Sequence, residues 1–172
     1  MPKFEPVRER SRVVVVEGHS TIHPIRSVSH EMEGWFEAEF LDGGELDPSF
    51  STAGRIEVFI DDFSTGNSFL DHELRRQLDT RRFPSVLAEL VDIRPQEGPD
   101  NYWATGDLTF HGETQRLEND LRVKYVNDQT IEVNGEITID VRNFNVDLPN
   151  LMFLKVHPVI KVTLEIVAER VA

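Results

Sequence analysis

The sequence predicts an all-β protein made of antiparallel strands, with one short helix near residues 68–79. Two observations support this class. Apolar and polar residues alternate along several segments, which gives an extended strand one apolar face and one polar face. Strands with one wet face belong to antiparallel sheets, because a parallel sheet is covered on both sides. Many such strands joined by short turns form a sandwich or a barrel.

The strands can be placed in order along the chain. The clearest alternation covers residues 130–141, where Ile131, Val133, Ile137 and Ile139 face one side. A β-branched run and partly alternating segments add further candidates. The strands expected from these patterns cover residues 13–16, 22–28, 35–41, 55–60, 86–93, 102–111, 117–125, 130–141 and 159–168. Within 22–28, Pro24 indicates an edge position or a bulge.

One segment departs from this period and predicts a helix over residues 68–79. Leu70, Leu74 and Leu78 recur every four residues and form a single apolar stripe. Asn67 or Ser68 can cap its N-terminus, and arginines lie near its end, where the helix dipole favours them. We expect this helix to lie across one end of the sheet. A structural lid and a functional gate would share this pattern.

Length and charge limit the domain organisation and the partners. With 172 residues the chain suits a single domain over 11–172, preceded by a loosely ordered lead-in over the charged, proline-broken residues 1–10. There are 18 Lys and Arg against 31 Asp and Glu, a net charge of −13, which would repel nucleic acid. No apolar run is long enough for a transmembrane segment, and residues 1–12 lack the apolar core of a secretory signal, so we expect a cytoplasmic protein.

No residue pattern calls for a catalytic, metal or cofactor site. The chain has no cysteine, which excludes thiolate ligands and nucleophiles. His19 and His23 would lie about 13 Å apart on a strand, too far to share an ion, and His30 has the opposite parity. Gly106 indicates a bulge, beside which we expect the Asp107 carboxylate to bond a neighbouring backbone amide.

Three blocks between residues 65 and 146 resemble the YceI-like family. They are Thr65-Gly66-Asn67 with Asp71, Leu74, Arg75 and Phe83-Pro84, then residues 105–114 (TGDLTFHGET), and then residues 139–146. Glu73 stands where the family has His. The resemblance implies a lipocalin-like eight-stranded antiparallel β-barrel that holds long apolar chains such as polyisoprenoids.

We therefore expect a protein that binds one long-chain apolar small molecule, a polyisoprenoid or a fatty-chain lipid, for storage or transport without chemistry. Two alternatives stay open: a barrel filled by its own side chains that acts as an interaction module, and an enzyme with polar groups such as His111 and Asp107 at the barrel mouth. The sequence also allows a homodimer. The candidate ligand-binding residues are Phe36, Phe40, Leu70, Leu74, Leu78, Leu108, Phe110, Ile137, Ile139 and Phe144.

Overall fold

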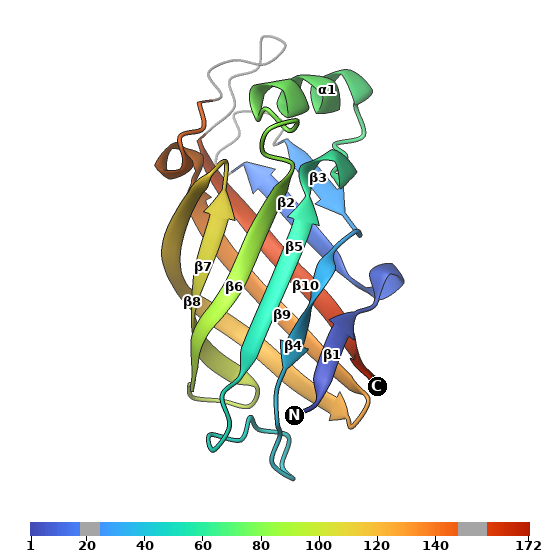
Figure 1. Ribbon diagram of the computed structural model, residues 1–172, viewed down its shortest axis with the longest axis vertical. Helices are drawn as coiled ribbons and strands as arrows, with labels where there is room; N and C mark the ends of the chain where they lie inside the picture. The colour runs from blue at the N-terminus through green and yellow to red at the C-terminus, as the bar shows by residue number, and fades with distance from the viewer. Residues whose placement is uncertain (18–24, 148–157) are drawn as a thin grey trace.

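The computed structural model describes residues 1–17, 25–147 and 158–172, which form one antiparallel sheet, one α-helix and three 3₁₀ helices (Figure 1). The ten strand segments are β1 (Lys3–Pro6), β2 (Arg12–Glu17), β3 (Arg26–Ser29), β4 (Glu33–Glu37), β5 (Ala53–Phe59), β6 (Ser85–Pro95), β7 (Asn101–Phe110), β8 (Glu113–Asn127), β9 (Thr130–Asp140) and β10 (Val159–Val171). The helices are α1 (Ser68–Gln77), η1 (Arg8–Arg10), η2 (Ile60–Asp62) and η3 (Val141–Phe144).

The sheet closes because β1 pairs with β4 on one side and with β10 on the other. Along β10, β1 pairs with residues 168–171 and β2 with residues 160–165, so β1 and β2 share one strand position that η1 interrupts. In the same way, β3 pairs with β2 and β4 pairs with β1, so β3 and β4 share the next strand position. The ten segments thus occupy eight positions, which confirms the predicted eight-stranded antiparallel barrel with one short helix.

Residues 1–10 differ from the loosely ordered lead-in that we expected. Lys3–Pro6 is strand β1, and Phe4 is only 1% exposed in the core. The charged and proline residues of this segment face outward or end the strand, and four residues are too few to show a period. Pairing with β4 and β10 supplies the order that local sequence does not.

The inner faces of the strands carry the predicted apolar residues. Along β5, burial alternates residue by residue, with Gly54, Ile56 and Val58 inside. In β9, Ile131 and Val133 are almost fully buried, and Glu132 between them lies on the more exposed face. The alternation in the sequence therefore gives the correct register, since a slip of one residue would expose every apolar side chain.

Helix α1 lies across the end of the barrel that is farther from the two termini (Figure 1). Asn67 caps it by accepting a hydrogen bond from the backbone N–H of Leu70, as predicted. The helix ends at Gln77, two residues earlier than expected, with Leu78 as its C-cap and Asp79 in the left-handed region at φ 51°.

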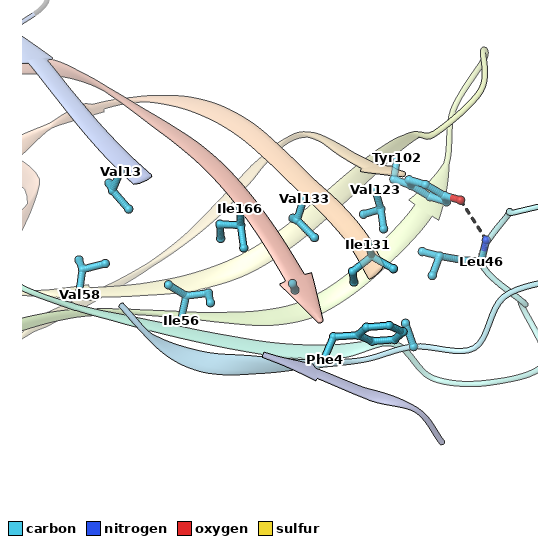
Figure 2. Packing of buried hydrophobic residues seen from close by; sticks show 12 residues of the cluster. Phe4, Val13, Leu46, Ile56, Val58, Tyr102, Val123, Ile131, Val133 and Ile166 are labelled. Atoms are coloured by element: carbon cyan, nitrogen blue, oxygen red, sulfur yellow. Dashed lines mark hydrogen bonds between the residues drawn. The ribbon is translucent and has the colours of Figure 1, made fainter. Parts of the chain in front are cut away.

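Side chains and the loop that follows β4 close the other end (Figure 2). The hydroxyl of Tyr102 accepts a hydrogen bond from the backbone N–H of Leu46 at 3.0 Å. The Phe40 ring packs against Phe4 at a centroid distance of 6.2 Å and against Tyr125 at 5.1 Å. These contacts leave the barrel with one packed end and one end covered by α1.

Candidate ligand-binding cavity

The interior of the barrel is not filled by its own side chains. A cavity of about 360 Å³ lies inside, between the packed end and α1. Its wall consists mainly of aliphatic side chains from the inner face of the barrel, among them Val58, Leu108, Ile137, Ile139, Val162 and Leu164. This size falls in the range of pockets that hold small molecules.

Seven of the ten predicted ligand-binding residues line this cavity: Phe36, Leu74, Leu78, Leu108, Phe110, Ile137 and Ile139. They come from β4, from α1 and its C-cap, and from β7 and β9. Strands far apart in the sequence thus bring these side chains together around one space.

Phe40, Leu70 and Phe144 do not line the cavity. Phe40 packs in the closed end. Leu70 is 7% exposed and contacts Ile25 and Leu74, because it lies one helical turn before the residues that face the interior. Phe144, in η3, is 1% exposed and packs on Phe110 at a ring distance of 5.6 Å.

Gly106 and Gly135 line the cavity and add no side chain to it. Both positions are tight, because a Cβ at Gly135 would lie 3.1 Å from Cδ1 of Leu121, and a Cβ at Gly106 would lie 3.1 Å from the carbonyl oxygen of Glu89. The bulge predicted at Gly106 is present, but the extra residue lies on the partner strand, between Leu90 and Asp92 of β6.

Strands β8 and β9 pair along only part of their length. These strands pair only between residues 121–127 and 130–135. Farther toward α1, β8 remains paired with β7, and β9 remains paired with β10. Side chains bridge this separation: the amide of Gln115 donates to the carbonyl of Asn143 at 3.2 Å, and the amide of Asn145 donates to Glu113 at 3.0 Å.

Asn119 of β8 is a polar lining residue that the sequence analysis missed. Its side-chain amide donates to the carbonyl of Asp120 at 2.8 Å, at the point where β8 leaves β9. Asn119 has the parity of Leu117 and Leu121, so the alternation of strand β8 could have placed it inside.

Most of this chain matches the model of one protein family. The model of the YceI-like domain matches residues 12–168 of the chain's 172 residues. The chain belongs to the YceI-like domain family. No match was found among curated proteins.

Solved structures share the fold of this YceI-like domain at low sequence identity. BcnA of Burkholderia cenocepacia has a TM-score of 0.77 and 18% identity, covering 94% of this chain and 98% of BcnA. A polyisoprenoid binding domain from Saccharophagus degradans has a TM-score of 0.75 and 13% identity, with 98% of both chains covered. The Campylobacter jejuni YCEI protein has a TM-score of 0.71 and 14% identity, with 90% of both covered.

The first block that resembled the family holds α1 in place over the barrel. The Asp71 carboxylate accepts hydrogen bonds from the backbone N–H and the hydroxyl of Thr65, at 2.9 and 2.6 Å. It also accepts one from the Ser64 hydroxyl at 3.4 Å. Together with the Asn67 cap, these bonds fix the turn before the helix.

Asp107 and His111, the two residues considered for an enzyme, contact neighbouring side chains of the described YceI-like domain. The carboxylate of Asp107 bonds the Arg116 side chain at 3.0 and 3.2 Å, not a neighbouring backbone amide as we expected. The bonds from Arg116 lower the pKa of Asp107. His111 lies in the turn between β7 and β8 at φ 54°, with its ring 4.4 Å from that of Phe83.

The histidines considered as metal ligands give no cluster within the part of the chain that the structure describes. His30 bonds the carbonyl oxygen of Ser11 through Nδ1 at 3.0 Å. His19 and His23 lie outside the described residues. Over residues 1–17, 25–147 and 158–172, no three His, Asp or Glu side chains are placed to hold a metal ion. No helix in these ranges has the length and hydropathy to cross a membrane.

Proposed function

We propose that this protein binds one long apolar molecule inside the barrel, a polyisoprenoid or a fatty-chain lipid, and stores or carries it without chemical change. The observation that carries this proposal is the 360 Å³ cavity with its aliphatic wall. The structural neighbour from Saccharophagus degradans, described as a polyisoprenoid binding domain, supports the same class of ligand.

The energy of burial explains why the ligand should be long. Removing one CH₂ group from water contributes about 0.8 kcal/mol, so one isoprene unit contributes about 3 to 4 kcal/mol. Association costs on the order of 4 to 15 kcal/mol in lost freedom. A single isoprene unit would therefore bind weakly, whereas a chain of several units would bind tightly.

The difference between the two ends of the barrel favours one orientation of the bound ligand. The end near Phe4 and Tyr102 is packed with apolar side chains. The end under α1 carries the charged residues Asp71 and Arg75 at the cavity. Because burying an unpaired polar group is costly, the apolar tail should point toward Tyr102 and the polar end toward α1.

Filling the cavity tests the proposal. Ile137→Trp adds a large side chain to the inner face of β9, whereas Thr138→Trp adds the same side chain to the outer face next to it. We expect Ile137→Trp to lower the affinity for a long-chain fluorescent probe at least about tenfold, since several CH₂ contacts are lost. Thr138→Trp serves as the matched control and should leave the affinity unchanged.

Equal affinities of the wild-type protein and both variants would place probe binding outside the barrel. A wild-type protein that binds no long-chain probe at all, after lipid extraction and refolding, would also refute the proposal.

A further inference from the structure

A guanidinium group lies at the mouth of this mostly apolar cavity. Arg75 of α1 lines the cavity together with Leu74 and Leu78. Its Nη2 donates to the backbone carbonyl oxygens of Asp61 at 2.9 Å and Phe63 at 3.4 Å. These bonds hold the side chain against η2.

The Nε of Arg75 has no hydrogen-bond acceptor. Among the described side chains, it is the one buried nitrogen or oxygen without a hydrogen-bond partner. The nearest carboxylate oxygen of Asp61 lies 3.7 Å away, which is an ion-pair distance but too long for a hydrogen bond. A buried donor without an acceptor is costly, so an oxygen brought by a ligand would be favoured here.

The other charged residue of the mouth does not supply this acceptor. The Asp71 carboxylate already accepts three hydrogen bonds from Ser64 and Thr65. It is engaged with the turn before α1, and no bond between it and Arg75 is formed among these contacts. Asp71 therefore leaves Nε of Arg75 without an acceptor among the described side chains.

The charges around the mouth favour an uncharged acceptor. Asp61 forms an ion pair with Arg75, and Asp71 lies at the same cavity, so two carboxylates already oppose one guanidinium. Asp62 follows in η2, and the whole chain has a net charge of −13. A ligand with an anionic end would add a third negative charge beside these two carboxylates.

We propose that the ligand ends in an uncharged oxygen acceptor, such as a hydroxyl, ester or carbonyl group, which accepts a hydrogen bond from Nε of Arg75. This inference rests on the proposed function and specifies the polar end of the ligand. The protein then selects neutral long-chain lipids over fatty-acid anions of the same length.

Three displacement ligands of equal carbon number test it: an alkane, an alcohol and a carboxylate, each competing with an apolar fluorescent dye. For the wild-type protein at neutral pH, the alcohol should bind about tenfold more tightly than the carboxylate. Arg75→Met should weaken alcohol binding about tenfold, because a hydrogen bond to a charged donor is lost, and should leave alkane binding nearly unchanged.

Arg76→Met is the matched control. Arg76 is the next residue of α1, but its side chain is exposed and bonds Glu73 at 2.8 Å. It should leave all three affinities unchanged. Arg75→Lys, which keeps the charge, should retain part of the preference for the alcohol.

The inference is overturned if the wild-type protein binds the carboxylate as tightly as the alcohol, a result that needs no variant to fold. It is also overturned if Arg75→Met weakens alkane and alcohol alike, because Arg75 then only packs. If no ligand, the alkane included, displaces the dye, then the proposed function itself fails.

Discussion

Inward-facing residues of the barrel have two different surroundings. Phe4 and Ile131 are each 1% exposed, because other side chains enclose them on all sides near the packed end. Leu108 and Ile137 have the same inward direction but are only partly buried, since one side of each faces the cavity. Partial burial of these aliphatic residues therefore reflects the internal cavity and not the outer surface.

The Tyr102 hydroxyl is the polar group of the packed end. Burial raises the pKa of Tyr102, and its hydroxyl accepts the hydrogen bond of the Leu46 N–H. Tyr102→Phe leaves this buried N–H without its acceptor, so we expect a loss of about 1 to 3 kcal/mol in the free energy of unfolding. Denaturant unfolding measures this loss. Tyr125→Phe, which keeps the ring contact with Phe40, should change stability less; an equal loss in both variants would contradict the assignment.

The sequence could predict which residues face inward but not which of them meet the cavity. Phe110 and Phe36 line it, whereas Phe40 and Phe144 pack in the core. Phe40 lies beyond the end of β4, in the closed end of the barrel, and Phe144 lies in η3, beyond the end of β9. Local alternation does not encode where a strand ends or which side chains surround the residues that follow it.

The leucine stripe of α1 contains both a residue that packs in the core and residues that line the cavity. Leu70 packs against Ile25 and holds the helix to the barrel, whereas Leu74 and Leu78 face the cavity. Sequence spacing predicts the stripe and the cap but does not show that its first leucine lies outside the site. The helix therefore lines the cavity from Asp71 to its C-cap, Leu78.

Shortening the leucines of α1 should affect ligand release. Replacing Leu74 and Leu78 by Ala removes apolar side chains at the mouth, so we expect release of a long-chain fluorescent probe to become several-fold faster. Stopped-flow displacement gives this rate.

Leu70→Ala is the matched control. It should lower stability by about 2 to 5 kcal/mol, as buried leucine truncations do, and change the release rate less. Unchanged release in the double variant, together with a large loss of stability, would show that Leu74 and Leu78 belong only to the core.

The separation of β8 from β9 should appear in hydrogen exchange. Alternate amides of β8 in residues 113–120 point to the side where no strand pairing with β9 is present, whereas residues 130–135 of β9 are paired with both β8 and β10. We expect those alternate amides of β8 to exchange faster than the amides of residues 130–135, in an NMR measurement on the ligand-free protein. Equal protection of the two groups of amides would contradict this wall geometry.

For the whole molecule, ring closure depends on contacts that are distant in sequence. Strand β1 joins β10 at the other end of the chain, and its four residues carry too little pattern to be recognised alone. The long strands β8, β9 and β10 were predictable, because eleven or more residues give a clear period. The sequence therefore predicts the barrel through its long strands, whereas the closure through β1 is seen only in the structure.

Ion pairs between neighbouring strands should make the barrel sensitive to acid. Arg12 of β2 bonds Glu165 of β10, and this bond lowers the pKa of Glu165. A lowered folded-state pKa stabilises the protein above the unfolded-state value, about 4.3, and this stabilisation is lost as the pH falls through the folded-state value. It is modest, because both side chains are 43% exposed.

The Arg12→Gln variant tests this pH dependence. Its melting temperature should lie slightly below that of the wild-type protein at neutral pH, and the two should converge below the folded-state pKa of Glu165. A difference that persists unchanged in acid would assign the effect of Arg12 to packing instead of to its charge.

The central claim is that the barrel cavity holds one long apolar molecule. Native mass spectrometry of gently purified protein tests it most directly, with organic extraction to identify what is released. We predict a species heavier than the polypeptide by the mass of one long-chain lipid, and loss of that species in the Ile137→Trp protein but not in the Thr138→Trp protein. A wild-type protein that carries only its polypeptide mass, and that gains no mass when incubated with polyisoprenoid or fatty-chain lipids, would contradict the claim.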